Sequence, residues 1–113
     1  SQAGAPVPAA LKAVSGTLEG RVLVLPPAGE PFVVGAALEA DLTIHGGDLD
    51  ERHALLVPDG QGHRIVPVAR GGTRLRGAPL NAATALREGD VIEFGPNRFV
   101  YCAAAGVEPL ALA

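Results

Sequence analysis

Charged side chains that could bind a ligand fall into two neighbouring segments of opposite sign. Residues 39–59 hold six acids and one base, Arg52, whereas residues 60–87 hold five arginines and no acid. Three of those arginines lie close together in the sequence: Arg70, Arg74 and Arg76. Clustered guanidinium groups suit a phosphate, because they offer several charge-assisted donors to its oxygens. Acids in the preceding segment have a competing use, since they can pair with the same arginines.

Three interpretations of this charge pattern stay open at the level of sequence. In the first, the acids and the arginines form exposed ion pairs, each stabilising the fold by well under ~1 kcal/mol. In the second, acids such as Asp50 and Glu51 occupy the place of an incoming phosphate. In the third, the arginines bind a phosphate or an acidic partner themselves.

Catalysis, metal binding and cofactor binding have little support. The chain contains no Gly-x-Ser-x-Gly motif and no phosphate-binding glycine loop followed by Lys-Ser or Lys-Thr. Its histidines and its cysteine show no spacing typical of a zinc site: His45, His53, His63 and Cys102. We therefore expect no enzyme, no metal and no cofactor.

Composition argues against several other classes of protein. The net charge is −3 and Lys12 is the only lysine, which disfavours a nucleic-acid partner. No apolar run approaches the length of about 20 residues that a membrane-spanning helix needs, so we expect no membrane insertion by this segment. A lone Cys102 cannot form an internal disulfide, which indicates a reducing, cytoplasmic location. The absence of methionine indicates a piece of a longer protein.

Short strands between tight turns are the elements that would position these residues. The chain has 15 glycines and 10 prolines in 113 residues, which is typical of one small all-β domain. Alternating or β-branched runs predict strands over residues 17–25, 32–34, 42–44, 54–57, 64–68, 73–75 and 78–80, before a closing hairpin. Asp59-Gly60-Gln61-Gly62 predicts a hairpin turn. Strands of this kind hide their apolar faces best as two packed sheets.

The two ends read as linkers rather than strands. Residues 1–16 are rich in alanine and proline and predict a mobile linker, with one or two helical turns at most. The folded domain is expected over residues 17–102. Residues 103–113 form a small, apolar C-terminal tail.

A closing hairpin over residues 86–101 is the most informative local pattern. It contains a Glu-Gly-Asp turn, a strand with Ile92 and Phe94, a Gly-Pro-Asn turn and a final strand. With the segments before it, this hairpin resembles the forkhead-associated (FHA) family over residues 17–102. The family's landmarks are a Gly-Arg pair after an early strand, Ser-x-x-His, Asn-Gly-Thr, a second Asn-Gly, and a leucine followed by Gly-Asp and a strand closed by Phe-Gly.

Agreement with those landmarks differs between structural positions and ligand-contacting positions. Residues that shape the backbone or fill the core match the family: Gly35, His53, Gly72, Thr73, Gly77, Leu86, Gly89, Asp90, Ile92, Phe94 and Gly95. Positions that contact ligand in the family mostly differ. Ala36 replaces the arginine, Asp50 the serine and Gly71 the first asparagine, and Arg76 replaces the second asparagine.

The resemblance implies an all-β fold, a two-sheet β-sandwich of the FHA/SMAD type with its ligand loops at one end. It also implies binding of phosphothreonine peptides, but the positions expected to hold the phosphate lack suitable donors. We therefore predict a phospho-independent protein-interaction module. Its partner would be another protein, another region of the same parent protein, or a second copy of the chain. Degenerate modules of this kind also occur in ring components of bacterial secretion machines.

The alternative is phosphothreonine-peptide binding through a displaced arginine cluster, Arg70, Arg74 and Arg76. Under either hypothesis the partner-binding loops are predicted to present Ala36, Asp48, Asp50, Glu51, Arg52, Arg70, Gly71, Thr73, Arg74 and Arg76. A structural brace is predicted to consist of Gly35, His53, Gly72 and Gly77. In that brace the resemblance implies that the His53 ring bonds to the backbone and holds the loops.

Overall fold

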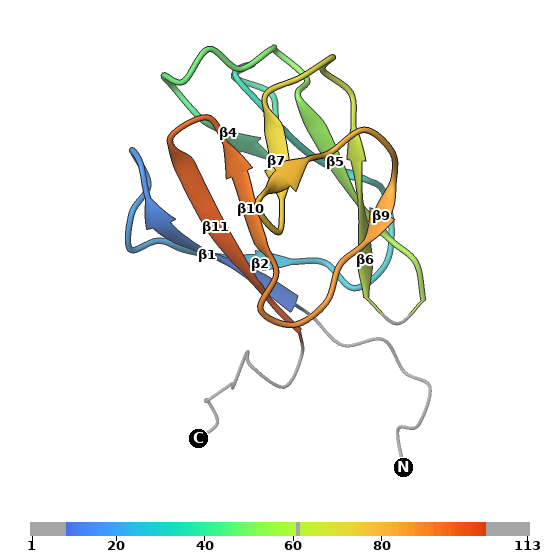
Figure 1. Ribbon diagram of the computed structural model, residues 1–113. Coiled ribbons are helices and arrows are strands. Elements are labelled where there is room, and N and C mark those ends of the chain that lie inside the picture. Colours follow the sequence, from blue (N-terminus) through green and yellow to red (C-terminus); the bar gives the residue numbers. More distant parts are fainter. Residues whose placement is uncertain (1–8, 61, 104–113) are drawn as a thin grey trace.

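The computed structural model describes residues 9–60 and 62–103, which form strands and connecting loops with no helix (Figure 1). The strands are β1 (Ala9–Ser15), β2 (Val22–Leu25), β3 (Phe32–Gly35), β4 (Leu42–Thr43), β5 (Ala54–Pro58), β6 (His63–Pro67), β7 (Thr73–Leu75), β8 (Ala78–Pro79), β9 (Thr84–Ala85), β10 (Val91–Phe94) and β11 (Asn97–Cys102). In this part of the chain no helix is long and apolar enough to cross a membrane.

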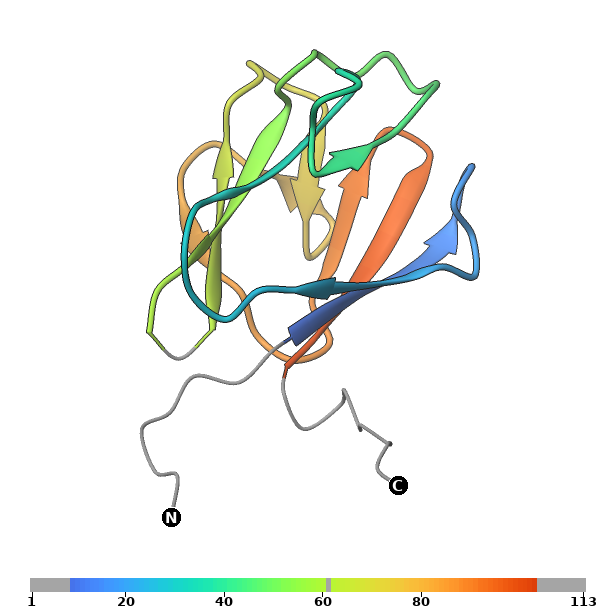
Figure 2. The same ribbon diagram turned by 180° about the vertical axis from the view of Figure 1, so that it is seen from behind.

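The strands form two sheets, which confirms the predicted two-sheet β-sandwich. One sheet has six strands in the order β2-β1-β11-β10-β7-β8, and the other has five in the order β4-β3-β5-β6-β9. Neighbouring strands are antiparallel except β3 and β4, which pair in parallel with Val34 beside Leu42. The loops joining β3 to β4, β4 to β5 and β6 to β7 gather at one end of the sandwich. The start of β1 and the end of β11 lie at the other end (Figures 1 and 2).

Apolar side chains from both sheets meet in a single core. Along β10 and β11 alternate residues point inward, so that Ile92, Phe94 and Phe99 are fully buried. The Phe94 and Phe99 rings meet edge to face with their centroids 5.9 Å apart. Leu11 and Leu56 complete the core from β1 and β5. The core therefore draws on the first and the last strands of the described chain as well as on the middle.

The linker predicted at the start of the chain is wrong for residues 9–15. They form β1, which lies between β2 and β11 and pairs Ala10 with Cys102. Ala9, Leu11 and Ala13 face the core, while Lys12 is exposed. Alanine is a poor strand former, so the alternation of buried and exposed residues in this segment does not predict a strand from the sequence. The segment becomes a strand because it pairs with β2 and β11. Residues 1–8 lie outside the described residues, as does the tail beyond Ala103.

The strand predicted over residues 17–25 begins later, at Val22. Residues 16–20 instead form the turn from β1 to β2, closed by a hydrogen bond of 2.8 Å from the Gly20 amide to the Ala13 carbonyl. The other predicted strands agree with the structure within one or two residues. β9, with only two residues, was not predicted. At the Asp59–Gly62 turn the Asp59 amide donates to the Gly62 carbonyl at 3.0 Å, as expected for the hairpin joining β5 to β6.

Candidate functional site

Three loops meet at the end of the sandwich where β3 ends. The Ala36 amide donates to the Asp50 carbonyl at 2.9 Å, and the Ala37 amide donates to the Glu51 carbonyl at 3.3 Å. Gly35 allows this close approach, because a methyl group on its Cα would collide with the Glu51 carbonyl oxygen. The loop after β3 and the loop before β5 are therefore held together through their backbones.

His53 links these loops to the core and to the loop before β7. Its side chain is buried, and its ring Nδ1 accepts a hydrogen bond of 3.1 Å from the Asp50 amide. The Val68 and Ala69 amides both donate to the His53 carbonyl at 3.0 Å. Below the loops the ring meets Phe94 edge to face, with centroids 5.8 Å apart. These contacts are the ones that a bracing histidine would make.

Gly72 covers the His53 ring. The Gly72 backbone has φ +88°, and a Cβ there would lie 3.0 Å from His53 Cε1. Because Nδ1 accepts from the Asp50 amide, the neutral His53 ring carries its proton on Nε2. Nε2 and the Thr73 hydroxyl are both buried and have no hydrogen-bond partner in the described part of the chain. Thr73 is too buried to present its side chain to a partner directly.

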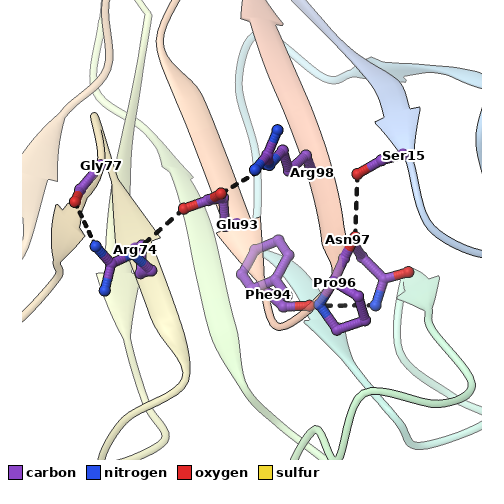
Figure 3. A network of polar contacts seen from close by, with 8 residues as sticks. All are labelled: Ser15, Arg74, Gly77, Glu93, Phe94, Pro96, Asn97 and Arg98. Carbon is purple, nitrogen blue, oxygen red and sulfur yellow. Dashed lines mark hydrogen bonds and ion pairs between the residues drawn. The ribbon is translucent and has the colours of Figure 1, made fainter.

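The tip of the last hairpin supports the same end of the molecule. Asn97 is 1% exposed, and its side-chain amide donates to the Phe94 carbonyl at 3.1 Å (Figure 3). The Ser15 hydroxyl donates to the Pro96 carbonyl at 3.0 Å. Gly47 packs against this tip, since a Cβ on it would lie 3.0 Å from Asn97 Nδ2. The Gly-Pro-Asn run, predicted from the sequence as a turn only, thus also supports the loop before Asp48.

The acids at this end do not pair with the arginines. Asp48, Asp50 and Glu51 are exposed, and none of them is in an ion pair within residues 9–60 and 62–103. The interpretations in which these acids are neutralised by the arginine-rich segment are therefore wrong for the described residues. The end of the sandwich that presents Asp50 is left with unpaired negative charge.

Arg74 is engaged on the outer face of the six-stranded sheet instead. Its guanidinium lies 3.3 Å from the Glu93 carboxylate and donates to the Gly77 carbonyl (Figure 3). Glu93 also pairs with Arg98 at 2.8 Å. One carboxylate is thus shared between arginines of two strands that flank β10.

Arg76 lies toward the opposite end of β7 from Thr73, because Thr73 pairs with Phe94 at the end of β10 whereas Leu75 pairs with Ile92. Arg76 contacts Asp90 through two hydrogen bonds, Nε to Oδ1 at 2.7 Å and Nη2 to Oδ2 at 2.8 Å. Two of the three arginines predicted to bind a phosphate, Arg74 and Arg76, are therefore already in ion pairs with other carboxylates. Gly77 follows Arg76 in the turn to β8 and does not brace the loops around Asp50.

The Arg76–Asp90 pair has a structural character. The Asp90 carboxyl also accepts the Arg87 amide at 2.7 Å, and its side chain is 8% exposed. Burial alone raises the pKa of Asp90, but the hydrogen bonds from Arg76 and Arg87 outweigh it and hold that pKa below its usual value. The pair therefore closes the turn before β10 and joins it to the turn between β7 and β8.

Among the predicted contact residues, Arg52, Arg70 and Gly71 remain exposed near the loop end. Gly71 has open space around it, since a Cβ there would meet nothing within 4 Å. Within the described residues no group of three or more His, Cys, Asp or Glu side chains could hold a metal ion. The chemistry available at this end is hydrogen bonding and charge, on a braced loop platform.

Comparison with known proteins gives a consistent family. The family model of the FHA domain matches residues 32–95. No curated protein sequence matches the chain. Among solved structures, Mycobacterium tuberculosis EmbR in complex with a low-affinity phosphopeptide superposes with a TM-score of 0.78 at 20% identity. That match covers 90% of this chain but 26% of EmbR, so the chain spans about a quarter of that protein.

Two further structures match over most of their length. The FHA domain of a hypothetical protein from Arabidopsis thaliana gives a TM-score of 0.79 at 22% identity, covering 88% of this chain and 87% of its own. The cytoplasmic domain of the T3SS sorting platform protein PscD from P. aeruginosa gives 0.71 at 25% identity, covering 84% and 79%. These matches and the family model confirm the resemblance inferred from the sequence. The chain belongs to the FHA domain family, whose members are β-sandwich modules for binding other proteins.

Proposed function

We propose that this FHA domain binds protein partners without requiring phosphothreonine. The observation that carries the proposal is the chemistry of three positions around the loop end, Ala36, Asp50 and Gly71. Ala36 has no donor group, Asp50 carries a charge of the same sign as phosphate, and Gly71 has no side chain to hold a peptide backbone. Fixed cationic and hydroxyl donors are what a phosphate needs, and these three residues supply none.

Electrostatics at the loop end favours the same conclusion. A phosphothreonine carries about −1.5 to −2 charges at neutral pH. It would approach the exposed and unpaired carboxylates of Asp50 and Glu51. Arg52 and Arg70 are also exposed near this end, but an exposed ion pair typically contributes no more than about 1 kcal/mol. These two arginines are outnumbered by the three exposed carboxylates of Asp48, Asp50 and Glu51.

The ion pairs of two arginines argue against the alternative, phosphothreonine binding through displaced arginines. It requires Arg70, Arg74 and Arg76 to converge on one phosphate. Arg74 is engaged by Glu93, and Arg76 is engaged by Asp90. Releasing Arg76 would leave the Asp90 carboxylate buried without its cation, which is costly.

A cytoplasmic, non-enzymatic role in a larger protein or assembly fits the remaining observations. Cys102 is a buried free thiol, which suits a reducing compartment. PscD, similar in fold, is described as having a cytoplasmic domain in a sorting platform. The partner of this chain would be a protein, another region of its own parent protein, or a second copy.

The proposal is tested by titrating the domain with a degenerate phosphothreonine peptide library and with the unphosphorylated library. We expect no preference for the phosphorylated peptides. A triple variant, Ala36→Arg with Asp50→Ser and Gly71→Asn, restores the family's donors and should gain such a preference. Space is available for the third change, since Gly71 has no neighbours near its Cα.

Selective binding of phosphorylated peptides by the unmodified domain would overturn the proposal. Arg70→Glu then identifies the cause, because loss of that binding would assign it to Arg70. Circular dichroism of the triple variant is the matched control, since a folded variant shows that its binding behaviour reflects chemistry and not misfolding.

A further inference from the structure

A recess lies beside the first residues of β3, and none of Asp50, Glu51 and His53 lines it. It has a volume of about 350 Å³ and opens between the β2–β3 connection and the first residues of β3. Its lining includes the apolar residues Pro26, Pro31 and Phe32 and two acids, Glu30 and Asp41. No basic residue lines it. The recess is at the beginning of β3, whereas the braced loops follow its end.

Several contacts fix the walls of the recess. Asp41 Oδ2 accepts the Val33 amide at 2.7 Å, which orients the carboxylate. The Pro26 carbonyl contacts His63 Nε2 at 2.8 Å, and His63 Nδ1 contacts the Tyr101 hydroxyl at 2.9 Å. Burial of the Tyr101 phenol, together with the carboxylates of Asp59 and Glu88, raises its pKa to about 12, so the hydroxyl keeps its proton at neutral pH. Pro26 and Asp41 are therefore held in place before any ligand binds.

Size and lining select the chemical class of ligand. A volume of about 350 Å³ is near the lower limit of typical ligand pockets, which suits a single long side chain. A lining that combines apolar side chains with two acids and no base matches a group that has an apolar stem and a cationic head. Arginine fits better than lysine, because its planar guanidinium stacks on aromatic rings and its fork of donors matches carboxylates.

The strand before the recess can hold the rest of such a ligand. β2 is an edge strand, and Leu25 directly precedes Pro26 of the recess. Val22 and Val24 of β2 are each 58% exposed. The other three edge strands of the described sheets, β4, β8 and β9, have two residues each. A four-residue apolar edge without a charged side chain is open to pairing with an extended segment.

We propose that the recess binds an arginine side chain of a partner protein, presented by an extended segment that pairs with β2. The acidic lining selects the guanidinium, and the exposed valines pack against apolar residues beside it. This site is separate from the loops around His53, so it adds a second contact surface to the domain. Its existence does not depend on whether the loop end binds phosphate.

The test is a titration of the ¹⁵N-labelled domain with the peptide acetyl-Val-Val-Arg-Val-amide, followed by NMR. We expect the amide signals of Val24 and Val33 to shift. Replacing the peptide arginine by citrulline, which keeps the shape and removes the charge, should weaken binding about tenfold, the loss typical of a charge-assisted hydrogen bond. Replacing it by lysine should weaken binding less.

Variants of the domain locate the site. Glu30→Gln and Asp41→Asn should each lower the affinity for the arginine peptide several-fold. The side-chain oxygen of the new asparagine could still accept the hydrogen bond from the Val33 amide. Glu39→Gln is the matched control, because Glu39 is an exposed acid that does not line the recess. Equal affinity for the arginine and citrulline peptides, absence of any shift, or shifts centred on residues 50–53 would each overturn the proposal.

Discussion

Phe94 and His53 join the core to the loop end through one ring contact. Phe94 is fully buried and lies against Phe99 on one side and the His53 ring on the other. His53 in turn accepts the Asp50 amide. A change in this part of the core therefore reaches the loop that carries Asp50 through two contacts.

Phe94→Ala should lower the free energy of unfolding by about 3–5 kcal/mol, the usual cost of truncating a buried aromatic residue. Urea denaturation followed by circular dichroism measures the loss. Val22→Ala is the matched control, because Val22 is 58% exposed and its truncation should change stability by no more than about 0.5 kcal/mol. Similar effects of the two changes would contradict this account.

Gly89 is predicted from the sequence to hold a backbone conformation that other residues tolerate poorly, and its φ of +85° confirms this. A Cβ at Gly89 would meet no neighbour within 4 Å, so the cost of a substitution there comes from the backbone alone. Gly89→Ala should therefore destabilise the domain by about 1 kcal/mol. Thermal unfolding checks this, and an unchanged or higher midpoint would refute it.

Single elements show where sequence reasoning succeeds and where it does not. The last hairpin was predictable, because Ile92 and Phe94 are strong strand formers between two recognisable turns. β1 was not predictable, because its inward residues include Ala9 and Ala13, and alanine is as common in linkers as in strands. Its pairing with β11 and β2 makes this segment a strand. A pairing between segments so far apart in the chain cannot be recognised from a short stretch of sequence.

Leu11→Ala tests whether β1 belongs to the core. Leu11 is fully buried, so its truncation should cost about 2–5 kcal/mol of the free energy of unfolding. Lys12→Ala, one residue along on the exposed side of the strand, should cost about 0.5 kcal/mol or less. If residues 9–15 were a linker, chemical denaturation would give the same small change for both.

The Asp90–Arg76 pair makes stability depend on acid pH. Because the folded state holds the pKa of Asp90 below its usual value of about 3.9, the pair stabilises the fold fully above that value. The contribution declines as pH falls below about 4 and is lost once pH passes the folded pKa. Asp90→Asn should therefore destabilise the domain at pH 7, and the difference from wild type should shrink at pH 3. The urea concentrations at the midpoint of unfolding, measured for both proteins at pH 7 and pH 3, test this prediction. The same difference between wild type and variant at both pH values would exclude the linkage.

At the scale of the whole molecule, most of the residues predicted for the partner-binding loops lie at one end of the sandwich, but not all of them do. Ala36, Asp50 and Gly71 lie in loops that meet there, as the family resemblance implied. Arg74 and Arg76 lie two residues apart along β7 and the turn after it, but Glu93 pairs with Arg74 whereas Asp90 pairs with Arg76. The spacing of the arginines could not show this, because their carboxylate partners, Glu93 and Asp90, come from a later segment of the chain.

The pairing of β1 with β11 also determines how the domain responds to force. Both strands leave the sandwich at the same end, with Ala10 opposite Cys102 and Ala13 opposite Phe99. Tension applied through the two strand ends loads the Ala10–Cys102 pair first, so the backbone hydrogen bonds break one pair after another. Attachment at Ala9 and Pro96 would load the same bonds together. We expect single-molecule pulling to open the domain at lower force through its ends than through Ala9 and Pro96, and equal forces would contradict this. A domain built in this way yields early under tension on its own chain, and can expose its core when a larger assembly pulls on it.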